Sequence, residues 1–490
     1  MRRLVASAAA VAMLALASGP AAAEGQTYTW SNSDYLAAGL PSSLTSVDTL
    51  NITGFTGLPD NVMHGVTLEN QGVVNWRRNS IGLDGSTINN AGLWNATSSS
   101  SMSQLLGARS VFNNTGVFRA TNTGDFASTT INMDFTNSGT VDVQGGILLL
   151  GGNSDFQDGT QLTGTGTGSV IVAGNANFSG RIHSDNLYIV SSTSTGNDAR
   201  LEGTTSRFEG GTLTGTWEIA SGHQMMVIGA AQQSLTNATL TNSGTVTLQG
   251  AASLKTSNGN IVNQGRFELQ GDGSVRYGGS PWVSTFTNQG LLVKSGGTGV
   301  SDFSQLYFSN TGTVDVRSGT LRLPDEIYNF GVMQGVGTIA SKQIHNYGRM
   351  KPGEDGVGTL TLDGNFSNES FIGIVDIGLG NAGSHALLSI TGDAALAGEL
   401  ALSCVGDCSF AVGEQFEVLH YAGTRSGTFE SLTLNGFGTG AFTTLYDDVN
   451  HSVELLVTEA VTAAVPEPDA WLLWAGGLGL VGLLARRRRA

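Results

Sequence analysis

The sequence is poor in charge, proline and cysteine. Of its 490 residues, 13% are charged and only 8 are proline, whereas 70 are glycine and 40% are apolar. An ordinary soluble domain has about 25% charged residues and about 7% glycine. The apolar share excludes a disordered chain. Because strong helix formers are few and turn and strand formers are many, the composition favours an all-β protein.

Positive charge is scarce. Residues 24–465 hold 17 basic and 37 acidic residues, a net charge of −20. Nucleic acid is a poor partner for such a surface, which would also repel anionic membranes and polyanions. The sequence contains no H-E-x-x-H, G-x-S-x-G or phosphate-loop motif, and its seven histidines fall at no metal-ligand spacing. It therefore predicts no catalytic residue, no metal ligand and no cofactor.

The two cysteines, Cys404 and Cys408, form a C-x3-C pair. They lack the partners that a four-ligand zinc site needs. Three interpretations stay open: a disulfide that closes a small loop, two free thiols, or metal or redox chemistry.

The first 23 residues predict a secretory signal peptide. Arg2 and Arg3 precede an apolar run, and Ala21 and Ala23 form an A-x-A cleavage site. The sequence thus predicts that the chain is exported.

The C-terminus predicts a membrane anchor. Residues 470–485 carry no charge and would form a short transmembrane helix of about 24 Å. Trp471 and Trp474 would lie at the interface, and the arginines at 486–489 would stay in the cytoplasm. The body of the protein would then lie on the far side of the inner membrane.

This C-terminal order closely resembles the PEP-CTERM sorting signal. A Pro-Glu-Pro motif precedes the apolar span, and an arginine cluster ends the chain: Pro466, Glu467, Pro468, Arg486, Arg487, Arg488 and Arg489. The resemblance implies processing by an exosortase-type membrane enzyme, after transient anchoring in the inner membrane of a Gram-negative producer. It also implies association with extracellular polysaccharide. A plain anchor that is left uncut is the alternative.

An Asn-x-Gly doublet recurs along the chain. Its asparagines are spaced by 17–25 residues within two groups, and 105 residues separate the groups: Asn70, Asn90, Asn114 and Asn137, then Asn242, Asn263, Asn288, Asn310, Asn329 and Asn346. A period of this length is typical of stacked repeats. The doublet suits a corner, because glycine and asparagine tolerate a positive φ.

Each doublet opens a short strand with period-two alternation. Thr136–Gly146 reads TNSGTVDVQGG, and 241–251 repeats it as TNSGTVTLQGA. Val141 and Val143 would point inward, and Asp142 outward. The pattern predicts a right-handed parallel β-helix over residues 24–350, in which equivalent asparagines stack. The two near-identical segments would then occupy equivalent positions on different coils. Residues 150–235 lose the doublet and are interpreted as degenerate coils, with an inserted domain as the alternative.

Residues 351–460 have strands without the period, and we expect a β-rich cap that hides the open end of the solenoid. This segment resembles the C-terminal part of autotransporter-type and PEP-CTERM β-helix proteins. The shared positions are Pro352, Gly353, Gly358, Thr359, Leu360, Thr361, Leu396, Gly398, Leu400, Ser426, Gly427 and Phe429. No translocation barrel follows, which argues against self-export. Residues 461–490 then form the sorting segment.

Two sets of side chains were candidates for a site. Glu268 and Asp315 would occupy matching outward positions two coils apart, about 9–10 Å, near the carboxylate separation of inverting glycosidases. Solvated surface charge is the alternative, since Val293 lies between them. Trp76, Trp94 and Phe118 would stack in the core, or else form a sugar-binding stripe.

These patterns together predict an exported, exosortase-processed surface or extracellular-matrix protein. Its role would be structural or adhesive, in association with exopolysaccharide and as part of a biofilm. A β-helix polysaccharide lyase or hydrolase is the alternative.

Overall fold

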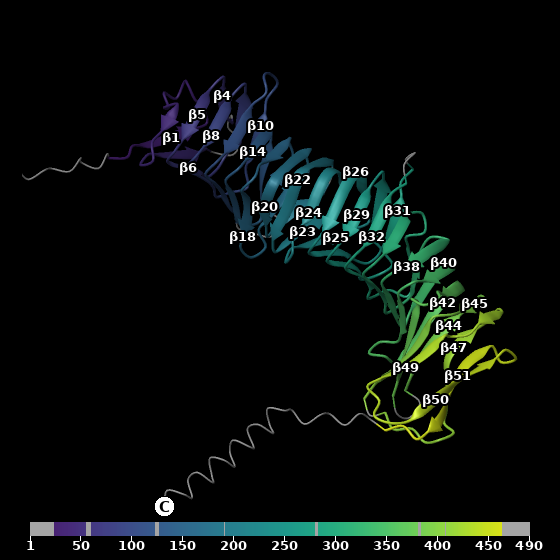
Figure 1. Ribbon diagram of the computed structural model, residues 1–490. Helices are drawn as coiled ribbons and strands as arrows, with labels where there is room; N and C mark the ends of the chain where they lie inside the picture. Colours follow the sequence, from purple (N-terminus) through teal and green to yellow (C-terminus); the bar gives the residue numbers. More distant parts are fainter. Residues whose placement is uncertain are drawn as a thin grey trace, which may run out of the picture.

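The computed structural model describes residues 24–54, 60–122, 127–190, 192–279, 283–380, 384–406 and 408–462, and within these residues it contains strands but no helix. Figure 1 shows a single curved rod, along which the strands stack in chain order from the N-terminal end to the C-terminal end. Each coil of the rod has three strand-bearing faces. The prediction of an all-β parallel β-helix is confirmed.

The first and second faces bend into one another and share six long strands. The first face holds β2 (Ser43–Leu44), β5 (Thr67–Asn70), β8 (Thr87–Asn90), β11 (Val111–Asn114), β14 (Asp134–Asn137), β17 (Ser154–Phe156), β28 (Ser253–Ser257), β31 (Ser274–Tyr277), β34 (Val300–Asp302), β37 (Thr320–Arg322), β44 (Ala386–Ile390) and β47 (Gln415–Tyr421). The second face holds β1 (Thr27–Ser31), β3 (Thr49–Thr53), β6 (Val73–Trp76), β9 (Leu93–Ala96), β12 (Val117–Thr121), β15 (Thr140–Gly145), β18 (Thr160–Gly164), β29 (Asn260–Asn263), β32 (Thr285–Asn288), β35 (Tyr307–Asn310), β38 (Glu326–Asn329), β45 (Ala394–Leu396) and β48 (Arg425–Gly427). The strands that cross both faces are β20 (Ala176–Ser184), β22 (Thr193–Gly203), β24 (Gly211–Ile219), β26 (Gln233–Asn242), β40 (Thr338–Asn346) and β42 (Gly358–Asn368).

The third face is one continuous ladder of 18 described strands, each parallel to the next. It holds β4 (Asn61–His64), β7 (Ile81–Asp84), β10 (Ser101–Gln104), β13 (Ser128–Asn132), β16 (Ile147–Leu150), β19 (Ser169–Val172), β21 (Leu187–Ile189), β23 (Thr205–Phe208), β25 (Gln224–Val227), β27 (Thr245–Leu248), β30 (Arg266–Leu269), β33 (Leu291–Lys294), β36 (Thr313–Val316), β39 (Val332–Gly335), β41 (Arg349–Pro352), β43 (Ile374–Leu379), β46 (Glu399–Cys404) and β49 (Ser431–Asn435).

The core is a column of apolar side chains inside the coils. Val141 and Val143 are buried as predicted, and the intervening Asp142 points outward. Trp76, Trp94 and Phe118 are fully buried. The Trp94 ring centroid lies 6.5 Å from that of Trp76 and 5.1 Å from that of Phe112. Core stacking is therefore confirmed, and the sugar-binding stripe predicted as its alternative is wrong.

Stacked asparagines run along the rod in two ladders. In the first, the Nδ2 groups of Asn70, Asn90 and Asn114 each donate to the Oδ1 of the next asparagine, at 2.6–2.7 Å. The second ladder has six such bonds of 2.7–2.8 Å and extends one residue beyond the repeats, from Asn242 to Asn368. All these side chains are buried. The predicted amide stacking is confirmed.

The two ladders lie at different corners of the coil, which corrects the prediction that the two copies of the phrase are equivalent. Asn137 ends β14 on the first face, and β15 follows on the second. Asn242 ends the second-face part of β26, and β27 follows on the third. Five coils plus one face therefore separate the copies.

The same Asn-x-Gly motif occurs at both corners because the two corners have the same structural requirements. The asparagine amide must reach along the axis, and the glycine two residues later must approach the coil before it. A Cβ on Gly116 would lie 2.3 Å from the carbonyl oxygen of Gly92, and one on Gly290 would lie 2.2 Å from that of Gly265. The motif therefore specifies a corner but not which corner.

The middle of the chain continues the stack. Strands β17 to β25 pair in parallel with their neighbours, so the described residues in 150–235 are coils and not an inserted domain. The doublet is absent because the first corner is here a short bend, with positive φ at Gly180, Asp198, Gly215 and Asn237. At the second corner the buried His223 ring lies 2.9 Å from the Ser206 Oγ, and burial lowers the pKa of His223 to about 4.

Both ends of the core are covered. At the N-terminal end the buried Tyr35 ring packs against Trp30, with centroids 5.0 Å apart. At the other end β51 (Ser452–Glu459) pairs antiparallel with β47 and with β50 (Ala441–Asp447). Parallel pairing runs past residue 350 to Asn435. The boundary expected between residues 350 and 351 is therefore too early, since the coils lose their sequence period before they stop stacking.

The hydrogen bonds of the asparagine ladder should contribute strongly to the free energy of unfolding. In Asn288→Ala, the Asn263 amide loses its acceptor, and Asn310 Oδ1 and the Thr313 carbonyl lose a donor. Because buried polar groups without partners are costly, we expect a loss of about 3 kcal/mol in the free energy of unfolding, measured by urea titration. Gln289→Ala, in the exposed middle of the same turn, should change it by less than about 0.5 kcal/mol. Equal effects would contradict this.

Candidate functional site

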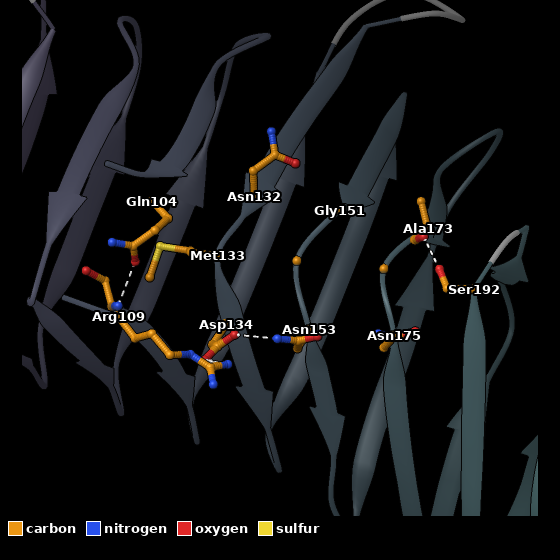
Figure 2. A pocket seen from close by; sticks show the side chains of 13 residues that line it. Gln104, Arg109, Asn132, Met133, Asp134, Gly151, Asn153, Ala173, Asn175 and Ser192 are labelled. Carbon is orange, nitrogen blue, oxygen red and sulfur yellow. Dashed lines mark hydrogen bonds and ion pairs between the residues drawn. The ribbon is translucent and has the colours of Figure 1, made fainter. Parts of the chain in front are cut away.

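An open groove of about 490 Å³ lies at the corner between the third and first faces. Figure 2 shows that it crosses several successive coils. Its floor consists of the short turns 132–134, 151–153 and 173–175 and of Ser192, and Gln104 and Arg109 line one end. The groove is therefore built from residues about 20 positions apart that the parallel stacking places side by side.

Glycines let the turns of the floor pack closely on one another. A Cβ on Gly151 would lie 2.2 Å from the Oδ1 of Asn132, and one on Gly174 would lie 1.8 Å from the carbonyl oxygen of Gly152. The turns can therefore nest only without side chains at these positions.

The polar side chains of the groove are amides, two serine hydroxyls and one charged pair. Arg109 pairs with Asp134, and the Asn153 Nδ2 donates to the Asp134 Oδ1 at 3.0 Å. The Asn175 Oδ1 accepts from the backbone N–H of Thr193 at 3.2 Å. Most of the Arg109 side chain remains exposed. The groove thus offers both donors and acceptors to a hydroxyl-rich ligand.

These residues were not predicted from the sequence, although the sequence contains a repeated pair that marks them. Gly152-Asn153 and Gly174-Asn175 repeat a Gly-Asn pair at a spacing of 22 residues. The register pairs Phe135 with Ser154 and Ser154 with Ala176, so Asp134, Asn153 and Asn175 form one row. A search for Gly-Asn pairs as well as Asn-x-Gly doublets would have found Asn153 and Asn175, but not Asp134.

The carboxylates Glu268 and Asp315 lie where the sequence placed them. The register pairs Glu268 with Val293 and Val293 with Asp315, so they are two coils apart on the third face. Each carboxylate is held by an arginine of its own coil: Arg266 Nη2 lies 2.9 Å from Glu268, and Arg317 Nε lies 2.8 Å from Asp315.

This pairing is unlike that of a catalytic acid. Chiefly because Arg266 hydrogen-bonds its carboxylate, the pKa of Glu268 lies below its usual value, although partial burial opposes the shift. A general acid needs a raised pKa. Both carboxylates are largely covered, and each is held as the partner of an arginine rather than as a free acid or base.

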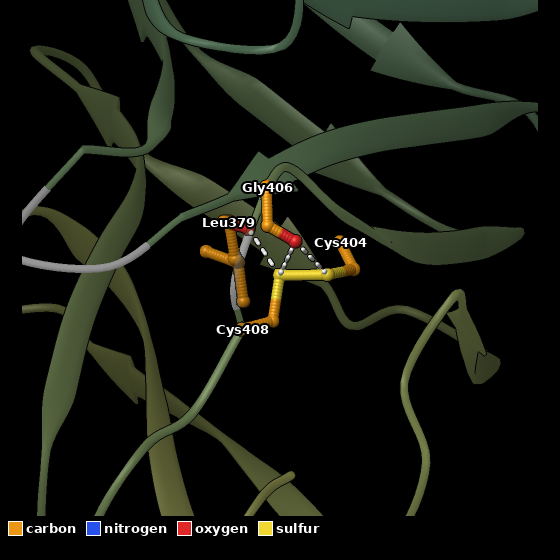
Figure 3. Close-up of a disulfide and its surroundings, with 4 residues drawn as sticks. All are labelled: Leu379, Cys404, Gly406 and Cys408. Atoms are coloured by element: carbon orange, nitrogen blue, oxygen red, sulfur yellow. Dashed lines mark hydrogen bonds between the residues drawn. A yellow bond between two sulfur atoms is a disulfide. The ribbon is translucent and has the colours of Figure 1, made fainter. Parts of the chain in front are cut away.

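Cys404 and Cys408 form a disulfide in the C-terminal coils (Figure 3). Cys408 is fully buried, and its Sγ lies 3.2 Å from the carbonyl oxygen of Leu379. In the described part of the chain, His, Cys, Asp and Glu form no group of three or more that could hold a metal ion. The bridge therefore closes the turn that follows β46.

Several predicted residues lie outside the described ranges. They are the signal peptide with Ala21 and Ala23, the Pro466-Glu467-Pro468 motif, the apolar span 470–485 and the arginines 486–489. No helix within the described ranges is long and apolar enough to cross a membrane.

The comparison with family models identifies the C-terminal segment. Residues 464–489 match the PEP-CTERM protein-sorting motif. No curated protein matches the chain. The chain thus carries a PEP-CTERM sorting signal on a β-solenoid body, and this signal marks an exported protein that is addressed to an exosortase.

The disulfide predicts how the thiols of the exported protein react. Protein purified without reductant should not react with a maleimide, and denaturation with reductant should release two thiols. Because the bridge closes a loop of few residues, Cys404→Ser/Cys408→Ser should lower the free energy of unfolding by about 2 kcal/mol. Reduced wild type is the matched control and should unfold like the variant. Labelling of the native, unreduced protein would contradict the bridge.

Proposed function

We propose that this protein is a structural component of the cell surface or extracellular matrix, held there by exopolysaccharide. The observation that carries the proposal is the joining of an exosortase sorting motif to a rigid solenoid with an open, amide-lined groove. The motif accounts for export, and the solenoid supplies a long surface for repeated weak contacts.

The outer surface suits a hydroxyl-rich partner. Amides and hydroxyls both donate and accept hydrogen bonds, so they can replace the water that surrounds a sugar chain. The net charge of −20 over residues 24–465 disfavours a polyanionic chain. A neutral polysaccharide is therefore the favoured ligand class.

A non-catalytic role is part of the proposal. It is supported by the ion pairs of Glu268 and Asp315, which keep both carboxylates occupied within their own coils. A β-helix lyase or hydrolase would need these groups free to meet a substrate.

The sorting motif should decide where the protein accumulates. In the producing cell, Pro466→Ala/Glu467→Ala/Pro468→Ala should keep the chain at full length in the membrane fraction. Wild type should appear with a lower mass in the polysaccharide-containing extracellular fraction. Asp469→Ala, the adjacent control, should behave as wild type. Fractionation and immunoblotting measure both effects, and wild type absent from the extracellular fraction would refute the proposal.

The proposed lack of catalysis has a direct assay. Purified residues 24–462, which contain every described strand, should release no reducing ends and no unsaturated products from neutral or anionic polysaccharides over a day. Turnover that disappears in Glu268→Gln, while Glu202→Gln on the second face leaves it intact, would establish the enzyme instead.

A further inference from the structure

Four aromatic rings are displayed in consecutive coils near the C-terminal end of the rod. Tyr328 lies on β38, Phe330 and Tyr347 are the middle residues of two successive Asn-x-Gly turns, and Phe371 lies in the turn after β42. Figure 1 shows β38, β40 and β42 next to one another along the rod. We call Tyr328, Phe330, Tyr347 and Phe371 the aromatic ridge.

Three rings of the ridge are exposed, and the fourth, that of Tyr347, is partly buried. Tyr328 is 46% exposed, Phe330 57% and Phe371 91%, whereas the largest aromatic side chains of the core are fully buried. Exposed aromatic residues that gather in one place mark interaction surfaces, whereas isolated ones are ordinary. The ridge therefore needs an explanation beyond the stability of the solenoid.

The rings stack along the axis of the rod. The centroids of Phe330 and Tyr347 are 5.1 Å apart with 25° between the planes, and Tyr328 stacks on the His345 imidazole at 4.9 Å and 9°. The buried ladder places them, because Asn329 donates to Asn346 at 2.8 Å directly beneath the two turns. The result is a platform of preorganised rings, which lose little conformational entropy when a ligand binds.

Phe371 is held in a backbone conformation that phenylalanine disfavours. Its φ is +66°, where glycine or asparagine is expected. The turn is held by Glu430, which lies two coils further along and accepts from the Phe371 N–H at 3.0 Å and from the Ser370 hydroxyl. The side chain is nearly fully exposed, so the core gains nothing from it. Strained residues of this kind cluster at ligand contacts.

Hydrogen-bonding groups border the rings. Glu326 accepts from the Tyr328 hydroxyl at 2.7 Å, and the Ser367 hydroxyl donates to Glu369 at 2.7 Å. More than half of the Glu326 side chain is exposed. Exposed ring surface beside carboxylate acceptors suits a pyranose, whose C–H groups can contact the rings while its equatorial hydroxyls donate to the carboxylates.

We propose that the aromatic ridge is the binding site for a neutral polysaccharide chain lying along the rod axis. The assignment rests on the proposed association with exopolysaccharide and names the site and the ligand class. A polyanion is disfavoured because Glu326, Glu369 and Glu430 border the ridge. A second copy of this chain is disfavoured because a two-fold contact would bring these same carboxylates together.

Affinity electrophoresis and calorimetry with residues 24–462 test the site. The neutral probes are hydroxyethylcellulose, galactomannan and dextran, and alginate is the anionic probe. Wild type should bind at least one neutral probe, and Tyr328→Ala/Phe330→Ala/Tyr347→Ala should weaken that binding by about tenfold or more. Tyr277→Ala, a half-buried tyrosine on the first face, is the matched control and should bind as wild type.

A second variant separates binding from folding. Phe371→Asn removes the ring and suits the positive φ, so the melting temperature should stay the same or rise while the affinity falls. A fall in melting temperature with unchanged affinity would make Phe371 a structural residue and remove it from the site.

The outcomes also separate this inference from the proposed function. Binding to alginate alone, or equal binding by the ridge variants and wild type, overturns the ridge proposal even where the protein still fractionates with the matrix polysaccharide. Self-association that the triple variant abolishes, seen by light scattering without glycan, would make a second copy the occupant and overturn it too. Absence of wild type from the polysaccharide-containing fraction would refute the proposed function itself.

Discussion

The structure depends on axial hydrogen bonding between identical positions of successive coils. Backbone ladders hold the three faces, and amide ladders such as that from Asn242 to Asn368 hold the corners. Because every asparagine donates to the next, each coil specifies the register of its neighbour. A rod with few charged residues can in this way be rigid and remain polar outside.

The same constraint explains how surfaces arise on this rod. Once the corners are in register, residues about 20 positions apart become neighbours. Similar residues in successive turns then form a continuous feature along the axis. Gly151 and Gly174 let short turns pack closely beneath the groove, whereas Phe330 and Tyr347 in the middle of their turns build a ridge. The groove and the ridge thus arise on one scaffold from different residues in the turns.

The repeating features of the fold were predictable from the sequence, whereas features confined to a few coils were not. The strands after each doublet and the buried row of Trp76, Trp94 and Phe118 were predictable, because alternation and period follow from local geometry. The second interpretation of these aromatics, a sugar-binding stripe, was wrong, and the exposed rings lie elsewhere. Glu268 and Asp315 were correctly aligned, and their arginine partners, two residues away on the same face, follow the same period-two spacing but were not predicted.

The class of fold, the stacking of asparagines and the sorting signal were predictable from the sequence alone, because each depends on residues close together in the chain or on a simple period. The three-dimensional structure was needed to show that the two copies of the repeated segment lie at different corners. It was also needed to show that the coils continue through residues 150–235 and past residue 350, and which surfaces are open. This is because the corners of a solenoid require the same local geometry and therefore accept the same residue types. Which side chains meet across coils depends on the number of residues in every preceding turn.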